Sequence, residues 1–429
     1  MFNKFWRKFC LLTLVGLFLG LGVSCSMPSP QSSGKSSSEV EFWTMQLQPQ
    51  FTEYFNKLIA AFEAENSAIK VRWVDVPWSD MEKKILASVS AKTAPDVVNL
   101  NPAFASLLAG RNAWLDLETK IPETTRSTFF PNIWKASSLN GKSFGIPWYV
   151  TTSILISNTD LLNKAGITQP PKTFTELATV AKTVKEKTGK YALFVSFVPE
   201  DSSEVLESFV QMGVPLVDAQ GKSAFNTPQG KAVFQYWVDL YKNNLLPKEV
   251  LTQGHRRAIE LYQSGETALL STGPQFLKTI EQNSPTIAKV SVPAPQITGI
   301  TGKKSVAVMN LVIPRDSNKA ENALKFALYV TNSENQLAFA KAANVLPSTI
   351  ASLKDSYFKD VPPNASPADQ GRIVSASQLP DSDILIPPLQ DIQKLKKAIY
   401  ENLQAAMLDQ KSVDNAIADA AKSWDSRSN

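Results

Sequence analysis

Both cysteines of this chain, Cys10 and Cys25, lie at its very beginning, so everything after Cys25 must fold without a disulfide bond. The same long segment contains a single histidine, His255. A zinc or iron–sulfur centre built on cysteine is therefore excluded there, and we expect neither a metal site nor a cofactor. The chain has 429 residues, of which 43% are hydrophobic. This is enough for two or three domains, or one bilobed body, stabilised by buried apolar side chains.

The charge balance gives little reason to expect a polyanionic partner. The formal net charge is +5, and +2 remains once the three cations Lys4, Arg7 and Lys8 are set aside. Proteins that bind nucleic acid usually carry a strongly basic face. We therefore expect no nucleic-acid partner.

The first residues have the organisation of an export signal. The basic start is followed by the uncharged apolar run Phe9–Val23, then Ser24, Cys25 and the Ser/Pro/Gly-rich spacer Ser26–Ser38. This resembles a bacterial lipoprotein signal, although Gly22 stands where that pattern has leucine. The resemblance implies a signal peptide over 1–24, lipidation of Cys25 and a flexible tether over 25–39. An uncleaved anchor helix is the alternative, and both place the body outside the cytoplasmic membrane.

The body alternates predicted strands and amphipathic helices, which is typical of the α/β class with a parallel sheet. The predicted strands are Val40–Trp43, Ile69–Val76, Pro95–Leu100 and the β-rich stretch Ile146–Ser157, which ends in a turn at Asn158–Asp160. The predicted helices are Pro49–Asn66, Ser79–Ala91 with Ser79 as N-cap, Thr173–Thr188, Thr227–Asn243, Pro387–Met407 and Ser412–Trp424.

One motif points to catalysis. Gly141–Gly145 fits the G-x-S-x-G turn of serine hydrolases, with Ser143 as nucleophile and His255 downstream. That turn needs a strand before the serine and a helix after it, whereas a β-rich stretch follows here. We therefore expect no enzyme, and keep a serine hydrolase as an alternative.

A series of short motifs, read in order, resembles the extracellular solute-binding proteins of sugar ABC importers, the family of maltose-binding protein. The motifs run over nearly the whole body; they are Glu41–Trp43, Ala94–Val98, Asn140–Trp148, Ser157–Leu162, Pro170–Phe174, Ser264–Ala268, Thr272–Pro274, Ile313–Ser317 and Leu408–Trp424. The resemblance implies an α/β, bilobed periplasmic-binding-protein fold whose two lobes are joined by crossing hinge strands. It also implies a sugar-binding function, periplasmic or cell-surface location, and permease subunits in the membrane as partners of a monomer.

On that pattern the chain divides into alternating lobes. The first lobe is 40–145 together with 305–347, which begins with the second crossing near Ser305–Asn310. The second lobe is 146–304, with the first crossing near Phe144–Val150. Residues 348–429 then supply C-terminal helices on the second lobe.

A sugar site needs aromatic platforms for C–H faces, and amides or backbone groups for hydroxyl edges. The candidates are residues at strand ends, helix starts and crossings: Trp43, Gln46, Asn99, Asn101, Trp148, Tyr149, Gln275, Phe276 and Asn310. Trp148 and Tyr149 at the first crossing are the principal expected contacts. Trp43 fits the core as well as the site, because it alternates with Val40 and Phe42.

Two other interpretations remain open. A ligand such as glycerol phosphate would require cationic side chains in the cleft, and only Arg111 lies near an expected cleft loop. A structural or chaperone-like lipoprotein would bind no sugar at all.

Overall fold

The computed structural model describes residues 38–201, 203–386, 389 and 391–426. The expected signal peptide, Cys25 and nearly all of the tether lie outside these residues. Within the described part, no helix combines the length and apolar character that a membrane span requires.

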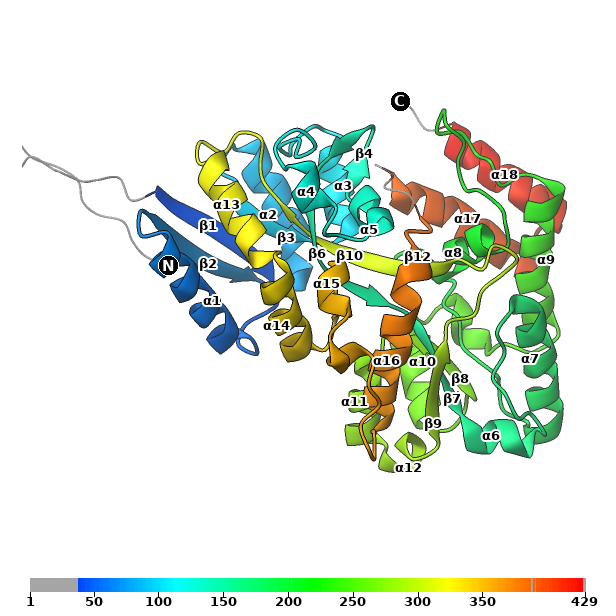
Figure 1. The fold of residues 1–429 in the computed structure, drawn as a ribbon. Coiled ribbons are helices and arrows are strands. Elements are labelled where there is room, and N and C mark those ends of the chain that lie inside the picture. Colours follow the sequence, from blue (N-terminus) through cyan, green and yellow to red (C-terminus); the bar gives the residue numbers. More distant parts are fainter. Residues whose placement is uncertain (1–37, 202, 387–388, 390, 427–429) are drawn as a thin grey trace, which may run out of the picture. The chain divides into compact units, whose positions relative to one another are not determined.

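The larger sheet has the strand order β11-β6-β10-β3-β1-β2 (Figure 1). Its strands are β1 (Ser38–Met45), β2 (Ile69–Val76), β3 (Val97–Leu100), β6 (Ile146–Thr152), β10 (Lys304–Val312) and β11 (Leu346–Pro347); β12 (Ser382–Asp383) pairs with the start of β10. β1, β2 and β3 are parallel to one another and β12 is parallel to β10, whereas β10 runs antiparallel to both β3 and β6. The expected parallel sheet is therefore confirmed for β1, β2 and β3, whereas β6, β10 and β11 join the sheet through antiparallel pairs.

Helices cover both faces of the larger sheet, as the alternation along β1 requires. Val40 and Phe42 pack with α1 (Thr52–Glu65), α13 (Ala320–Val330) and α14 (Ser333–Ala343). Trp43 and Met45 face the other way, towards α2 (Trp78–Ser90) and α3 (Pro102–Ala109). Shorter elements complete this part: α4 (Glu123–Arg126), α5 (Pro131–Ala136), α15 (Ile350–Leu353) and the hairpin of β4 (Ser138–Leu139) and β5 (Lys142–Ser143).

The smaller sheet is fully antiparallel, with β7 (Ile154–Asn158) between β8 (Leu269–Thr272) and β9 (Ser291–Pro295). Its helices share one hydrophobic core. They are α6 (Thr159–Lys164), α7 (Phe174–Thr188), α8 (Glu204–Gln211), α9 (Pro228–Lys242), α10 (His255–Gln263), α11 (Gln275–Asn283), α12 (Pro285–Ala288), α16 (Pro367–Gln378), α17 (Ile392–Met407) and α18 (Val413–Asp425). Short 3-10 turns lie at η1 (Lys248–Leu251), η2 (Ser356–Phe358) and η3 (Leu379–Asp381).

Local signals explain several element ends. The side chains of Thr173, Thr227 and Ser412 cap α7, α9 and α18 by accepting a backbone N–H. Ser79 does not cap α2, which begins at Trp78 after Pro77; the expected N-cap is wrong. Asn158 caps α6, so the expected turn at Asn158–Asp160 begins a helix instead.

The chain passes between the two sheets at Ser153. Residues of β6 pair with β10 as far as Thr152, and β7 joins the smaller sheet from Ile154. This is later than the expected first crossing at 144–150, because β6 fills a place in the larger sheet between β10 and β11. A boundary at Ser153 rather than at 145/146 is our revised proposal for where the first part of the second lobe begins.

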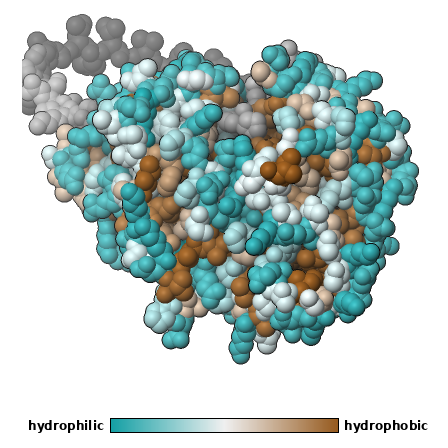
Figure 2. Space-filling model, turned by 45° about the vertical axis from the view of Figure 1, so that its right-hand side comes forward, coloured by the Kyte–Doolittle hydropathy of each residue, from teal (hydrophilic) through white to brown (hydrophobic). Residues whose placement is uncertain are grey.

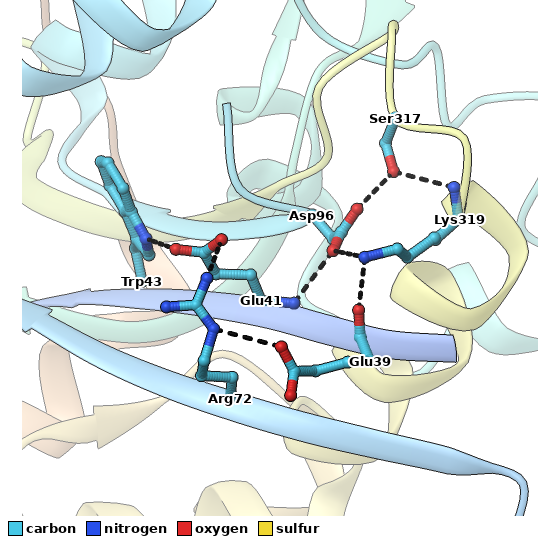
Figure 3. A network of polar contacts seen from close by, with 7 residues as sticks. All are labelled: Glu39, Glu41, Trp43, Arg72, Asp96, Ser317 and Lys319. Carbon is cyan, nitrogen blue, oxygen red and sulfur yellow. Dashed lines mark hydrogen bonds and ion pairs between the residues drawn. The ribbon is translucent and has the colours of Figure 1, made fainter. Parts of the chain in front are cut away.

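A network of hydrogen bonds and ion pairs connects the first half of β1 to residues of neighbouring segments (Figure 3). Its centre is Asp96, which is 7% exposed. The Asp96 carboxylate accepts hydrogen bonds from the backbone N–H of Glu41 at 2.9 Å and from Ser317 Oγ at 2.7 Å, and it lies 3.4 Å from Lys319 Nζ. The network also contains Glu39, Trp43 and Arg72.

Hydrophobic residues form separate patches between hydrophilic ones on the face that Figure 2 shows. Among the described residues, Ile300 is the most exposed large apolar side chain, at 80%, and Trp78 at the start of α2 is 45% exposed. Scattered exposure of this kind is ordinary for a soluble surface.

Candidate solute-binding cleft

Two adjoining pockets share the side chains of Ser203 and Glu207. The first, of about 280 Å³, is lined by α8, α10, β8 and residues of the smaller sheet's core. The second, of about 220 Å³, is lined by the start of α3, by Ser305–Ala307 of β10, and by apolar residues between β12 and α17. Because one wall comes from the larger sheet and the other from α8, the two pockets together form a cleft that both halves of the protein line.

The wall contributed by α8 is acidic. Glu204 and Glu207 stand three residues apart on this helix, so both lie on one face while Val205, Leu206 and Phe209 are buried on the other. Ser271 on β8 hydrogen-bonds to the Glu204 side chain, and Ser305 on β10 to the Glu207 side chain. Both carboxyl groups are partly accessible through the cleft.

The surroundings of these two carboxyl groups raise their pKa values. Burial, followed by the charges of Glu207 and Asp201, raises the pKa of Glu204 to about 8 against the opposing hydrogen bond from Ser271. Burial also raises the pKa of Glu207, although Ser305 and the ammonium group of Lys396 oppose the shift. Lys396 is 4% exposed, and its own burial lowers its pKa.

The rest of the lining consists of uncharged polar, aliphatic and aromatic side chains, with Phe174 and Trp237 as the aromatic members in the first pocket. Thr272 Oγ1 lies 3.1 Å from Nε2 of His255, and burial lowers the pKa of His255 against the charge of Asp201. Gln211, Gln296 and Ser305 add further hydrogen-bonding groups; Leu155, Ile297, Ile384, Ile386 and Leu389 add apolar surface. Among the described residues that line the two pockets there is no lysine or arginine.

Trp148 does not lie in the cleft. Its side chain is 0% exposed and stacks on Phe339, with ring centroids 4.8 Å apart and an angle of 25° between the rings. It also contacts Phe42 and Phe55 in the core beneath α1 and α14. The structure therefore places Trp148, expected as a stacking platform, in the core of the larger sheet and outside the two pockets of the cleft.

Tyr149 is half-buried and packs against both cores of the larger sheet, with its ring centroid 5.0 Å from that of Trp148 and 5.3 Å from that of Phe339. Burial and the nearby charge of Asp75 raise the pKa of its hydroxyl. Trp43 is 7% exposed and donates its Nε1–H to Glu41 Oε1 at 2.7 Å, while Lys84 Nζ lies 4.3 Å from its ring centroid. Trp43 therefore belongs to the core under α2 and to the network around Asp96.

The amide candidates at the strand ends mostly serve the fold. Asn99 is fully buried and donates to the Asn310 carbonyl at 3.4 Å. Asn310 is 1% exposed, accepts from Ser137 and donates to the Val308 carbonyl. Asn101 caps α3 and also lines the second pocket, so it is the sequence candidate that the structure places in the cleft.

The remaining candidates lie outside the two pockets. Gln46 is exposed, and its Oε1 accepts from the backbone N–H of Trp78 at 3.3 Å. Gln275 is exposed at the start of α11 and borders a separate small pocket beside Arg372. Phe276 is half-buried, with its ring 6.2 Å from that of His255.

The serine-hydrolase motif is not assembled into a catalytic site. Ser143 is fully buried in the β4–β5 hairpin, where its Oγ donates to the Gly145 carbonyl at 3.5 Å. A strand rather than a helix follows it, and His255 lines the cleft next to Thr272. Arg111, the expected anion contact, lines another pocket together with Lys92 and Arg315.

Sequence reasoning missed Glu204 and Glu207 because α8 was not predicted. The signal was present as two acidic residues at helical spacing within Glu204–Gln211, a stretch whose other face is apolar. In the described part of the chain, no three or more His, Cys, Asp or Glu side chains are grouped so that they could hold a metal ion.

Two sheets with alternating helices, linked by crossing strands and sharing a cleft, define the bilobed periplasmic-binding-protein class. The model of the family "Bacterial extracellular solute-binding protein" matches residues 48–337. The chain therefore belongs to the bacterial extracellular solute-binding proteins.

Individual relatives agree with this assignment. The crystal structure of a periplasmic-binding protein from Synechococcus sp. MITs9220, provisionally named as oligosaccharide-binding, is 42% identical, has a TM-score of 0.83, and covers 90% of this chain and 98% of its own. Another structure of that protein is a zinc complex. The arabinooligosaccharide-binding protein of Bacillus subtilis (strain 168) is 25% identical over 76% of this chain and 76% of its own. The cyclic α-maltosyl-1,6-maltose binding protein of Arthrobacter globiformis shares the fold, with a TM-score of 0.77 at 20% identity, covering 90% and 98%.

Proposed function

We propose that this protein is the substrate-binding lipoprotein of an ABC importer, and that it captures a neutral oligosaccharide or glycoside in the cleft between its lobes. It delivers the sugar to permease subunits in the membrane as a monomer tethered through Cys25. It acts as a binder and not as an enzyme. The names of the Synechococcus, Bacillus and Arthrobacter relatives support the substrate class.

The observation that carries the proposal is the lining of the cleft at Glu207. Hydroxyl, amide and carboxyl groups there match the hydroxyl edges of a sugar, and the aliphatic residues of the second pocket match its C–H faces. The absence of lysine and arginine among the described lining residues favours a neutral solute over glycerol phosphate. Since the two walls come from different lobes, a bound ligand that touches both stabilises the closed state.

The test is a ligand screen of the purified protein by thermal shift, followed by calorimetric titration. The panel holds arabinotriose, maltotriose, cellotriose, monosaccharides, sugar alcohols and glycerol 3-phosphate. We expect at least one neutral oligosaccharide to raise the melting temperature and glycerol 3-phosphate to have no effect. Binding of glycerol 3-phosphate alone, or of no member of the panel, would contradict the proposal.

A blocking variant locates the site. Ser203→Trp places a large ring where the two pockets meet. We expect it to weaken binding at least tenfold, while the melting temperature without ligand stays near that of the wild type. Ser377→Trp on the exposed face of α16 is the matched control and should bind normally. Equal affinity in both variants would place the sugar elsewhere.

A further inference from the structure

The carboxyl groups of Glu204 and Glu207 on α8 lie in the cleft, beside the place where its two pockets adjoin. Glu207 lines both pockets, and Glu204 lines the first. Each is held by a serine from a different strand, Ser271 on β8 and Ser305 on β10. A sugar that fills the first pocket must therefore touch this pair or displace the water that solvates it.

Titratable groups approach the pair from three directions. They are Glu200 and Asp201 in the segment before α8, His255 on α10, and Lys396 and Tyr400 on α17. The described residues of β8 and α3 contribute only uncharged side chains. The balance is acidic, because the ammonium group of Lys396 faces the carboxylates of Glu200, Asp201 and Glu207.

We propose that Glu204 and Glu207 form one proton-sharing pair that contacts the bound sugar, so that capture of a neutral sugar requires the pair to carry a proton. The inference rests on the proposed function and deepens it. A carboxyl group that keeps its proton donates one hydrogen bond and accepts another, whereas an ionised one only accepts. The pair thereby offers a sugar hydroxyl both kinds of partner.

The sign of the pH dependence follows from desolvation. A neutral ligand removes water from the pair without supplying a compensating charge, which raises the pKa further and makes binding take up a proton. Affinity is then complete below the pKa of the free pair and falls as the pH rises through it. With the pKa of Glu204 at about 8, affinity at pH 9 is about tenfold weaker than at pH 7. At pH 8, about half a proton is taken up per ligand.

Calorimetric titration measures both quantities. The probe is arabinotriose or maltotriose, whichever binds more tightly in the screen, titrated between pH 7 and pH 9.5 in two buffers of different ionisation enthalpy. Wild type should show the loss of affinity and the proton uptake. The double variant E204Q/E207Q, whose amides stay neutral, should bind with an affinity that does not change with pH and without proton uptake. Glu186→Gln, on the exposed face of α7, is the matched control.

The choice of pH range and one further variant distinguish the titration of the pair from that of the neighbouring groups. Burial lowers the pKa of His255 from 6.5, so its titration falls below this range, while that of Tyr400 lies well above 10. Lys396→Met removes the ammonium group that opposes the shift of Glu207. The loss of affinity should then move to higher pH; if it vanishes, Lys396 is the titrating group and the proposal falls.

The results that would contradict the proton linkage differ from those that would contradict sugar binding. If a sugar binds with an affinity that is flat or rising between pH 7 and pH 9.5, the pair is not proton-linked, although the protein still binds sugar. A pH dependence that persists in the double variant likewise overturns the proposal. Melting temperatures without ligand, measured at each pH, exclude unfolding as the cause of lost binding.

Discussion

Replacing Trp148 with alanine should destabilise the first lobe and leave ligand recognition intact. The ring is 0% exposed and contacts Phe42, Phe55, Tyr149 and Phe339 with centroid distances from 4.8 to 6.4 Å. Truncating a fully buried tryptophan in such a core costs about 3–5 kcal/mol, from lost apolar burial and the cavity that remains. We expect a loss of this size in the free energy of unfolding.

Trp148→Phe is the informative companion variant. Nε1 of Trp148 is buried without a hydrogen-bond partner among the described residues. Phenylalanine keeps most of the ring and removes a donor whose burial costs about 1–3 kcal/mol. The two effects oppose each other, so this variant should unfold within about 1 kcal/mol of wild type.

The assay is equilibrium urea unfolding followed by far-ultraviolet circular dichroism, because nine tryptophans would confuse a fluorescence signal. Ligand affinity is measured below the unfolding transition of every variant. Should Trp148→Ala unfold like wild type and yet lose the ligand, the ring would be a sugar contact and our reading of the core would be refuted.

Three further changes test separate features. Gly230→Ala should destabilise α9 by about 3 kcal/mol in urea unfolding, because the new Cβ would lie 1.8 Å from the Phe225 carbonyl oxygen; unchanged stability would contradict this contact. Asp96→Ala should cost about 1–3 kcal/mol by leaving its donors without an acceptor, whereas the exposed neighbour Asp316→Ala should cost little; equal effects would argue against the network. Cys25→Ser should abolish incorporation of labelled fatty acid, and equal labelling in both proteins would exclude a lipid anchor at this residue.

Regular patterns in the sequence predict local structure well and its assembly less well. The strand Ile69–Val76 has the predicted bounds, and Thr173 and Thr227 begin helices as expected. These features depend on neighbouring residues alone. Which sheet a strand joins depends on partners far along the chain, and the expected crossing at 144–150 falls on β6, which pairs with β10 in the larger sheet.

The candidate site was harder to predict, for the same reason. Ile146 and Trp148 share one side of β6 at a spacing of two, which already indicates a core-facing ring. We nevertheless predicted Trp148 as a ligand contact, because it lies next to the expected hinge. Glu204 and Glu207 become site residues only because α8 packs against β8, β10 and α17, a juxtaposition that no local pattern contains.

The place of β10 in the larger sheet determines when the protein can fold. This strand, Lys304–Val312, lies between β6 and β3 and pairs with both. Until it has been synthesised, the sheet consists of β1 to β3 on one side and an unattached β6 on the other. Contacts so distant along the chain form slowly. The larger sheet can therefore be completed only after Lys304–Val312 has been synthesised.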